Sequence, residues 1–120
     1  MKLSEQTEKL NHHLETLRER FEKSEAPSDR KDRSFFNMVK AETAPIYDLL
    51  ESWERDASAA VKERKASVHP NQVQSTRENM ELLLMHSYYL DVRRKRYMEL
   101  YTSIRYVFDL LLDTLEEEDK

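Results

Sequence analysis

Apolar residues recur at helical spacing along almost the whole chain. In the first segment the apolar positions are Leu3, Leu10, Leu14, Leu17 and Phe21. Their steps of seven, four, three and four residues keep the side chains on one face of an α-helix. We therefore expect an amphipathic helix over residues 4–24. The polar stretch that follows contains Pro27 and has no such spacing, which is typical of a connection.

A second periodic segment predicts a helix over residues 43–65. Thr43 can cap its start, and Pro45 suits the first turn, where a missing N–H would be unpaired in any case. The apolar stripe is formed by Ile46, Leu49, Leu50, Trp53 and Ala57. Ahead of this helix, Phe35 and Phe36 belong to a short apolar patch. We expect residues 34–40 to form a short extra helical turn that plugs one end of the core.

Residues 70–118 contain no glycine, and no proline after Pro70. Their apolar spacing is unbroken, so one long helix is a possible interpretation. Bundles, however, pair helices of similar length, and the most polar stretch of this region lies near its middle. We predict two helices, over residues 70–91 and 94–118, and whether residues 91–94 separate them is left to the structure.

Four amphipathic helices with short connections predict an all-α fold, an antiparallel (up-down-up-down) four-helix bundle. At 120 residues the chain is expected to form a single domain over residues 1–120. Trp53, the only tryptophan, is expected to anchor the core. The predicted core consists of Leu14, Leu17, Phe21, Phe36, Ile46, Leu49, Trp53, Leu83, Tyr101, Ile104, Phe108 and Leu111.

Composition narrows the possible functions. The chain has no glycine, which phosphate-cradling loops need where backbone approaches phosphate. It has no cysteine, which excludes disulfides, thiolate metal sites and thiol nucleophiles. A net charge of −4 disfavours general nucleic-acid binding, and no apolar run approaches the roughly 20 residues of a membrane span. We expect a cytoplasmic protein without nucleic-acid or membrane partners.

The histidines do not form a recognisable metal or catalytic motif. A di-iron bundle site needs Glu-x-x-His, and the residues three positions before the four histidines are Lys9, Leu10, Ala66 and Leu83. His12 and His13 are adjacent and diverge by about 100° around a helix axis. His86 and Ser87 are neighbours that point apart on a helix. We therefore expect no catalytic residue, no metal ligand and no cofactor.

The sharpest local feature is the basic run Arg93-Arg94-Lys95-Arg96, followed by Tyr97. These five residues are the candidate contact for an anion or an acidic partner. The alternative interpretation is a solvated turn between two helices. The surrounding region, residues 86–97, also contains His86 and further tyrosines.

Several of these residues together resemble a known family. They are Ser34-Phe35-Phe36 ahead of a proline-started helix, Trp53, His69-Pro70 with Gln72-Val73, Glu78-Asn79-Met80, Ser87-Tyr88 and Arg94-Lys95-Arg96-Tyr97. The pattern covers most of residues 34–118 and resembles the YppE-like family of small proteins from Bacillus-type bacteria. The resemblance implies a four-helix bundle in a bacterial cytoplasm. It implies no activity, cofactor or catalytic residue.

Two functions remain open at this point. The first is a non-enzymatic helical bundle that acts through protein–protein contacts with an unknown protein partner, as a monomer or weak homo-oligomer. The alternative is a small-molecule or anion-binding protein, or a cryptic enzyme, that uses the basic and tyrosine-rich bundle end near residues 86–97. A deep pocket with convergent polar side chains would favour the alternative.

Overall fold

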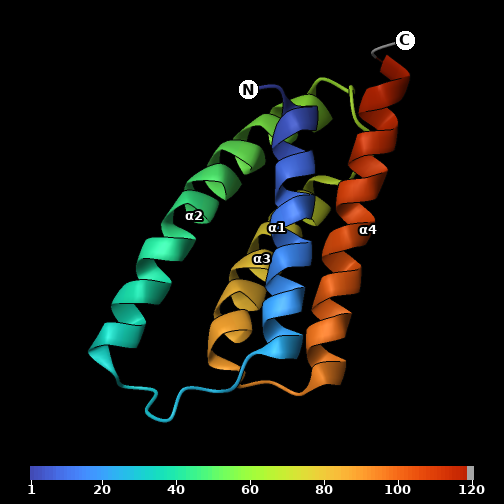
Figure 1. Cartoon of the computed structure of the whole chain (residues 1–120). Coiled ribbons are helices and arrows are strands. Elements are labelled where there is room, and N and C mark those ends of the chain that lie inside the picture. The colour runs from blue at the N-terminus through green and yellow to red at the C-terminus, as the bar shows by residue number, and fades with distance from the viewer. Residues whose placement is uncertain (119–120) are drawn as a thin grey trace.

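The computed structural model describes the backbone of residues 1–118 and the side chains of residues 1–115. Its described residues form four α-helices and no strand, which confirms the all-α prediction (Figure 1). The helices are α1 (Leu3–Lys23), α2 (Arg33–Lys62), α3 (Pro70–Tyr89) and α4 (Arg94–Glu118).

Successive helices run in opposite directions along the bundle. Figure 1 shows the α1–α2 and α3–α4 connections at one end and the α2–α3 connection at the other. α1 packs against all three other helices, whereas α2 and α4 lie diagonally opposite. The molecule measures 50 × 27 × 22 Å, so its two ends are well separated. We call the end that holds the α1–α2 and α3–α4 connections the loop end.

The second helix begins ten residues earlier than the sequence predicted. α2 starts at Arg33 and not at Thr43, and the separate turn predicted over residues 34–40 is its first part. Asp32 caps this start, because its side chain accepts a hydrogen bond of 2.9 Å from the Ser34 N–H. Pro45 consequently lies inside the helix, where it leaves the carbonyl of Ala41 without its helical donor. Both residues are exposed, so water can satisfy that carbonyl.

The break between the last two helices lies where the sequence placed it. α3 ends at Tyr89, two residues before the predicted end, and α4 begins at Arg94. Leu90 between them adopts a left-handed conformation with φ 52°. This conformation is unfavourable for a residue with a Cβ, and it turns the chain although no glycine is present. The N–H of Leu90 still donates to the carbonyl of His86 at 2.9 Å.

Most of the predicted core is buried. Leu14, Leu17, Ile46, Trp53, Leu83, Ile104, Phe108 and Leu111 lie in the core, and Phe21, Leu49 and Tyr101 are half-buried against it. Phe36 was predicted wrongly, since 53% of it is exposed. Its neighbour Phe35 turns inward and packs edge-on against Tyr89, with ring centroids 5.2 Å apart. Adjacent residues on a helix point about 100° apart, so the two phenylalanines cannot share the core face.

Trp53 connects three helices through one side chain. It is fully buried, and its ring meets Phe108 of α4 edge-on at a centroid distance of 5.3 Å. Its indole Nε1–H donates to the Thr7 hydroxyl of α1 at 3.0 Å. The Thr7 hydroxyl in turn donates to the carbonyl of Leu3 at 2.8 Å. The polar atom of the tryptophan is therefore satisfied inside the core, as buried donors require.

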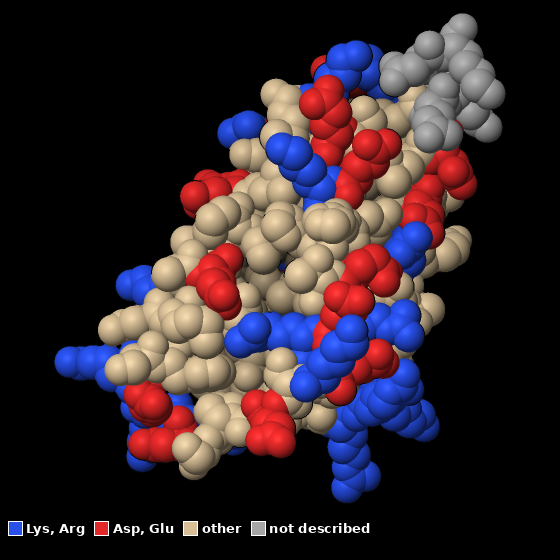
Figure 2. All heavy atoms as spheres, in the orientation of Figure 1, with Lys and Arg blue, Asp and Glu red and all other residues tan. Residues whose placement is uncertain are grey.

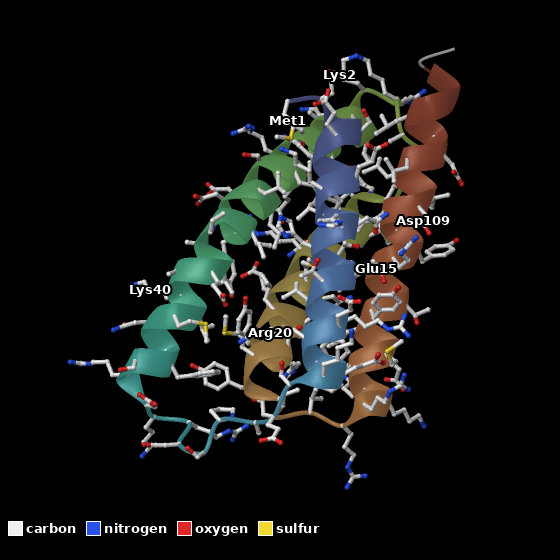
Figure 3. All side chains as sticks on the ribbon, viewed as in Figure 1. Met1, Lys2, Glu15, Arg20, Lys40 and Asp109 are labelled. Atoms are coloured by element: carbon white, nitrogen blue, oxygen red, sulfur yellow. The ribbon has the colours of Figure 1, made fainter. Side chains whose placement is uncertain are left out.

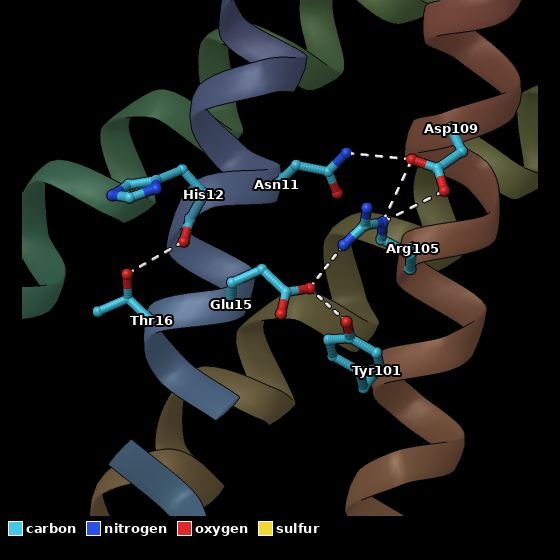
Figure 4. Close-up of polar contacts among 7 residues, drawn as sticks. All are labelled: Asn11, His12, Glu15, Thr16, Tyr101, Arg105 and Asp109. Atoms are coloured by element: carbon cyan, nitrogen blue, oxygen red, sulfur yellow. Dashed lines mark hydrogen bonds and ion pairs between the residues drawn. The ribbon is translucent and has the colours of Figure 1, made fainter. Parts of the chain in front are cut away.

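A polar network fastens α1 to α4 on the outside of the core (Figure 4). Glu15 accepts hydrogen bonds from Arg105, at 2.6 Å, and from the Tyr101 hydroxyl. Asp109 accepts from Arg105 and from Asn11, both at 3.2 Å. Figure 3 shows Glu15 and Asp109 between the two helices. Every charged group of this network has a partner within it, so we interpret the network as a structural contact that stabilises the packing of α1 against α4.

Candidate functional site

The predicted basic run lies on the surface at the loop end. Arg93 precedes α4, and Arg94, Lys95 and Arg96 form its first turn; all four are exposed. Figure 2 shows Lys and Arg side chains projecting from the loop end beside the start of α4. Cations at a helix N-terminus oppose the helix dipole. This arrangement is therefore not explained by the stability of α4 itself.

Tyr97 does not belong to this surface, which corrects the prediction that it contacts a partner. It is fully buried, and its ring stacks on Phe21 at a centroid distance of 3.9 Å. Its hydroxyl shares a hydrogen bond of 2.6 Å with the Ser87 hydroxyl. Burial raises the pKa of Tyr97 to about 12. Tyr97 is thus a core residue that joins α1, α3 and α4.

Half of the basic run is already paired with acids. Arg94 Nη2 lies 2.9 Å from Glu22 Oε1 of α1, and Arg96 Nη1 lies 3.6 Å from Glu99 Oε2. Arg93 and Lys95 have no acidic partner among the described residues. The run therefore presents two uncommitted cations to solvent.

A second basic segment, residues 30–33, lies at the same end and was missed from sequence. Arg30 Nη2 lies 3.2 Å from Asp91 Oδ2, which connects the α1–α2 and α3–α4 connections. Lys31 and Arg33 are exposed and have no acidic partner within the described part of the chain. We define Lys31, Arg33, Arg93 and Lys95 as the basic end.

The basic character of residues 30–33 was missed because acidic residues lie among the cations. Asp29 and Asp32 alternate with the basic residues, so the segment reads as nearly neutral in sequence. In the structure, the Asp29 side chain accepts from the N–H of Lys31 at 2.9 Å. The Asp32 side chain caps α2. Both carboxylates accept from backbone donors, while Lys31 and Arg33 remain available. The exposed ring of Phe36 lies beside them, and Arg30, Lys31, Arg33, Phe36 and Asn37 line a shallow cavity of about 530 Å³.

His86 braces the turn between α3 and α4. Its Nδ1 lies 2.7 Å from Asp91 Oδ1, and Asp91 also binds Arg30. Partial burial alone would raise the pKa of Asp91. The hydrogen bonds from His86 and from its own backbone, with the charge of Arg30, outweigh burial and lower that pKa. Tyr97 is buried in the core and His86 is held by Asp91, so the structure does not gather these two residues into one pocket with Arg93, Arg94 and Arg96. The small-molecule alternative therefore loses His86 and Tyr97.

No metal centre emerges from the described side chains. Among them, no group of three or more His, Asp or Glu residues is placed to hold an ion. The rings of His12 and His13 are 6.3 Å apart and tilted by 56°. Burial, followed by the charges of His12 and Lys9, lowers the pKa of His13. In residues 1–118 no helix combines the length and the apolar character that crossing a bilayer demands.

Comparison with known proteins agrees with the fold. The family described as a bacterial domain of unknown function, DUF1798, matches residues 7–115. The chain is 25% identical over 118 residues to the uncharacterised protein YppE of Bacillus subtilis strain 168, a match that covers 98% of this chain and 94% of the relative. The resemblance to YppE-like proteins drawn from the sequence is thereby confirmed.

Two solved structures share the architecture. The crystal structure of YppE from Bacillus subtilis matches with a TM-score of 0.83, and its solution NMR structure matches with a TM-score of 0.80. Each is 23% identical in sequence and covers 98% of this chain, and the matches cover 94% and 95% of the respective YppE chains. At this identity the likeness supports the fold alone.

Proposed function

Since the chain belongs to the DUF1798 family of bacterial domains, whose function is unknown, we propose a function from its own surface. It is a non-enzymatic binding protein that docks a carboxylate-rich segment of another protein on the basic end. One observation carries the proposal: two segments about 60 residues apart in sequence bring four exposed cations, none with an acidic partner among the described residues, to the same end of the bundle.

Carboxylates suit these cations better than a nucleic-acid backbone does. Arg33 and Arg93 can each take a carboxylate through two parallel N–H donors, and Lys31 and Lys95 add point charges. A duplex would extend beyond four cations onto a molecule whose net charge is −4. The exposed ring of Phe36 adds an apolar contact amid the charges. The expected partner segment is acidic and includes an apolar residue.

The surface is held in place before any partner arrives. The Arg30–Asp91 pair ties the two connections together, and the Arg94–Glu22 pair ties the start of α4 to the end of α1. A preformed site loses less conformational entropy on binding than a mobile loop does. The cytoplasmic location expected from the sequence is part of this proposal and stays a prediction.

The test compares three proteins in affinity capture from the native cytoplasm, with mass spectrometry. They are the wild type, a variant with Lys31, Arg33, Arg93 and Lys95 changed to Gln, and a control with Lys2, Lys9, Lys40 and Lys62 changed to Gln. The control removes the same charge from other exposed positions. Figure 3 shows its Lys2 at the opposite end and its Lys40 on the outer edge of α2.

We expect at least one stoichiometric partner that the wild type and the control retain and the basic-end variant loses. Its retention should weaken with added salt, because screening acts within about 8–10 Å at physiological ionic strength. A synthetic peptide of the partner's most acidic segment should then compete. Identical sets of partners for all three proteins would refute the proposal.

A further inference from the structure

An open groove between α3 and α4 differs in chemistry from the rest of the surface. Its volume is about 460 Å³, within the roughly 300–1,000 Å³ of ligand pockets. Its principal lining residues are Asn71, Ser75 and Asn79 from α3 and Thr102, Ser103 and Tyr106 from α4. None of the described lining residues is charged, although charged residues make up 37% of the chain. The groove is therefore a neutral, polar strip on a highly charged protein.

Apart from Gln72, whose side chain accepts a hydrogen bond from the His69 N–H at 2.8 Å, the polar side chains of this groove are not used by the fold. Elsewhere, the hydroxyls of Thr7, Thr43, Ser87 and Thr114 donate to the carbonyl four residues earlier, at 2.7–2.9 Å. The groove hydroxyls make no such bond in the part of the chain that the structure describes. The side-chain amides of Asn71 and Asn79 and the phenol of Tyr106 also make no hydrogen bond among the described residues. These groups keep their donors and acceptors for another molecule.

Tyr106 supplies the apolar part of the groove. It is 62% exposed, the most exposed aromatic residue of the described chain, and no ring packs on it. An aromatic ring with a polar tip suits a ligand that is apolar on one face and hydrated at its edge. The ring therefore offers a platform beside the amides and hydroxyls.

We infer that the α3–α4 groove binds a neutral, polyhydroxylated ligand of the saccharide class, stacked on Tyr106. A charged ligand would lose hydration without gaining a countercharge from the lining. An apolar ligand would cover amides and hydroxyls and leave them unpaired. A sugar ring presents C–H groups on its face and hydroxyls around its edge, so it satisfies both parts of the groove. The groove adjoins the basic end, because Thr102 and Ser103 also line a cavity beside Lys95. Asn79 and Tyr106 line the groove and not that cavity, so they distinguish the two sites.

The experiment is an NMR titration of the full chain, labelled with ¹⁵N, against three neutral disaccharides: cellobiose, maltose and di-N-acetylchitobiose. With at least one of them we expect saturable shifts, confined to α3 and α4 around Asn79 and Tyr106. Tyr106→Ala and Asn79→Ala should each weaken binding by about tenfold or more. Leu82→Ala is the matched control, because Leu82 is an exposed α3 residue outside the groove. It should bind as the wild type does.

Three results would overturn the inference. The first is no saturable shift with any of the three sugars at millimolar concentration. The second is unchanged binding by both Tyr106→Ala and Asn79→Ala, with thermal melting showing that both variants are folded. The third is a set of groove shifts that follows protein concentration without sugar, which would assign the groove to a second copy of the chain. The variant with Lys31, Arg33, Arg93 and Lys95 changed to Gln should still bind the sugar. The saccharide inference and the proposed docking function can therefore be refuted independently.

Discussion

Two aromatic residues of α2 show how position outweighs residue type. Trp53 is fully buried and bonded to Thr7, whereas Phe36 is 53% exposed. Both are large apolar residues, and both were predicted to lie in the core. The hydrophobic contribution of a residue depends on the area removed from water, so the two should differ greatly in energetic effect.

Truncating Trp53 is expected to destabilise the protein strongly. Trp53→Ala should lower the free energy of unfolding by about 3–5 kcal/mol, because it leaves a cavity between α1, α2 and α4 and removes the indole hydrogen bond to the Thr7 hydroxyl. Phe36→Ala, the matched control, should change it by less than about 0.5 kcal/mol. Urea unfolding followed by circular dichroism measures both. Equal losses for the two variants would contradict the observed core.

Buried tyrosines should make the fold sensitive to alkali. Burial raises the pKa of Tyr97 and of Tyr88 to about 12. A group whose pKa is higher in the folded state binds its proton more tightly there. Its stabilising effect is complete below about pH 10, the unfolded pKa. The effect is lost as the pH rises through about 12.

Ultraviolet titration of the phenolate checks this prediction. Two of the six tyrosines should ionise last, near pH 12, together with loss of helical signal. Tyr97→Phe should remove one of these late ionisations. Simultaneous ionisation of all six tyrosines in the folded protein would be inconsistent with the burial of Tyr97.

At the scale of the element, α2 carries an internal proline, Pro45, whose energetic cost depends on where the helix begins. If α2 began at Thr43, Pro45 would lie in its first turn and would cost nothing. Because α2 begins at Arg33, Pro45 interrupts the ladder, at a cost of up to about 3 kcal/mol in a helix interior. Pro45→Ala should therefore raise the free energy of unfolding, by about 1–2 kcal/mol once the greater freedom of the unfolded chain is included.

Urea midpoints of wild type and Pro45→Ala measure the effect. Pro27→Ala is the control, since Pro27 lies in the α1–α2 connection. It should give no increase. A Pro45→Ala variant with unchanged stability would favour the later helix start.

The sequence predicted which segments are helical better than it predicted their ends. Spacing of apolar residues located all four helices, because each buries one face. The start of α2 was missed because Pro45 suggested a boundary, while the Asp32 cap was not recognised. The wrong prediction that Phe36 lies in the core followed from the same error. Leu90 adopts a left-handed conformation, which is unfavourable for leucine, so the residue type could not predict this turn.

At the scale of the whole molecule, the candidate site depends on what the fold brings together. The run 93–96 was visible in the sequence, but Lys31 and Arg33 come to the same end of the molecule only through the bundle topology. Whether a charge is free also depends on the fold, since Arg94 finds Glu22 across 72 positions of sequence. Sequence alone could not separate the free cations of the run from the paired ones.

This separation leads to a final prediction about stability and binding. Arg93→Gln with Lys95→Gln removes two unpaired cations from the N-terminal end of α4, where they oppose the helix dipole. The free energy of unfolding should stay within about 0.5 kcal/mol of wild type, with any change upward, while the captured partner is lost. Arg94→Gln with Arg96→Gln removes the same charge but breaks two ion pairs, so any change in stability should be downward. Urea unfolding and affinity capture on both variants separate a binding surface from a structural one. If Arg93→Gln with Lys95→Gln markedly lowers the urea midpoint, those side chains support the fold, and the basic end is not a binding surface.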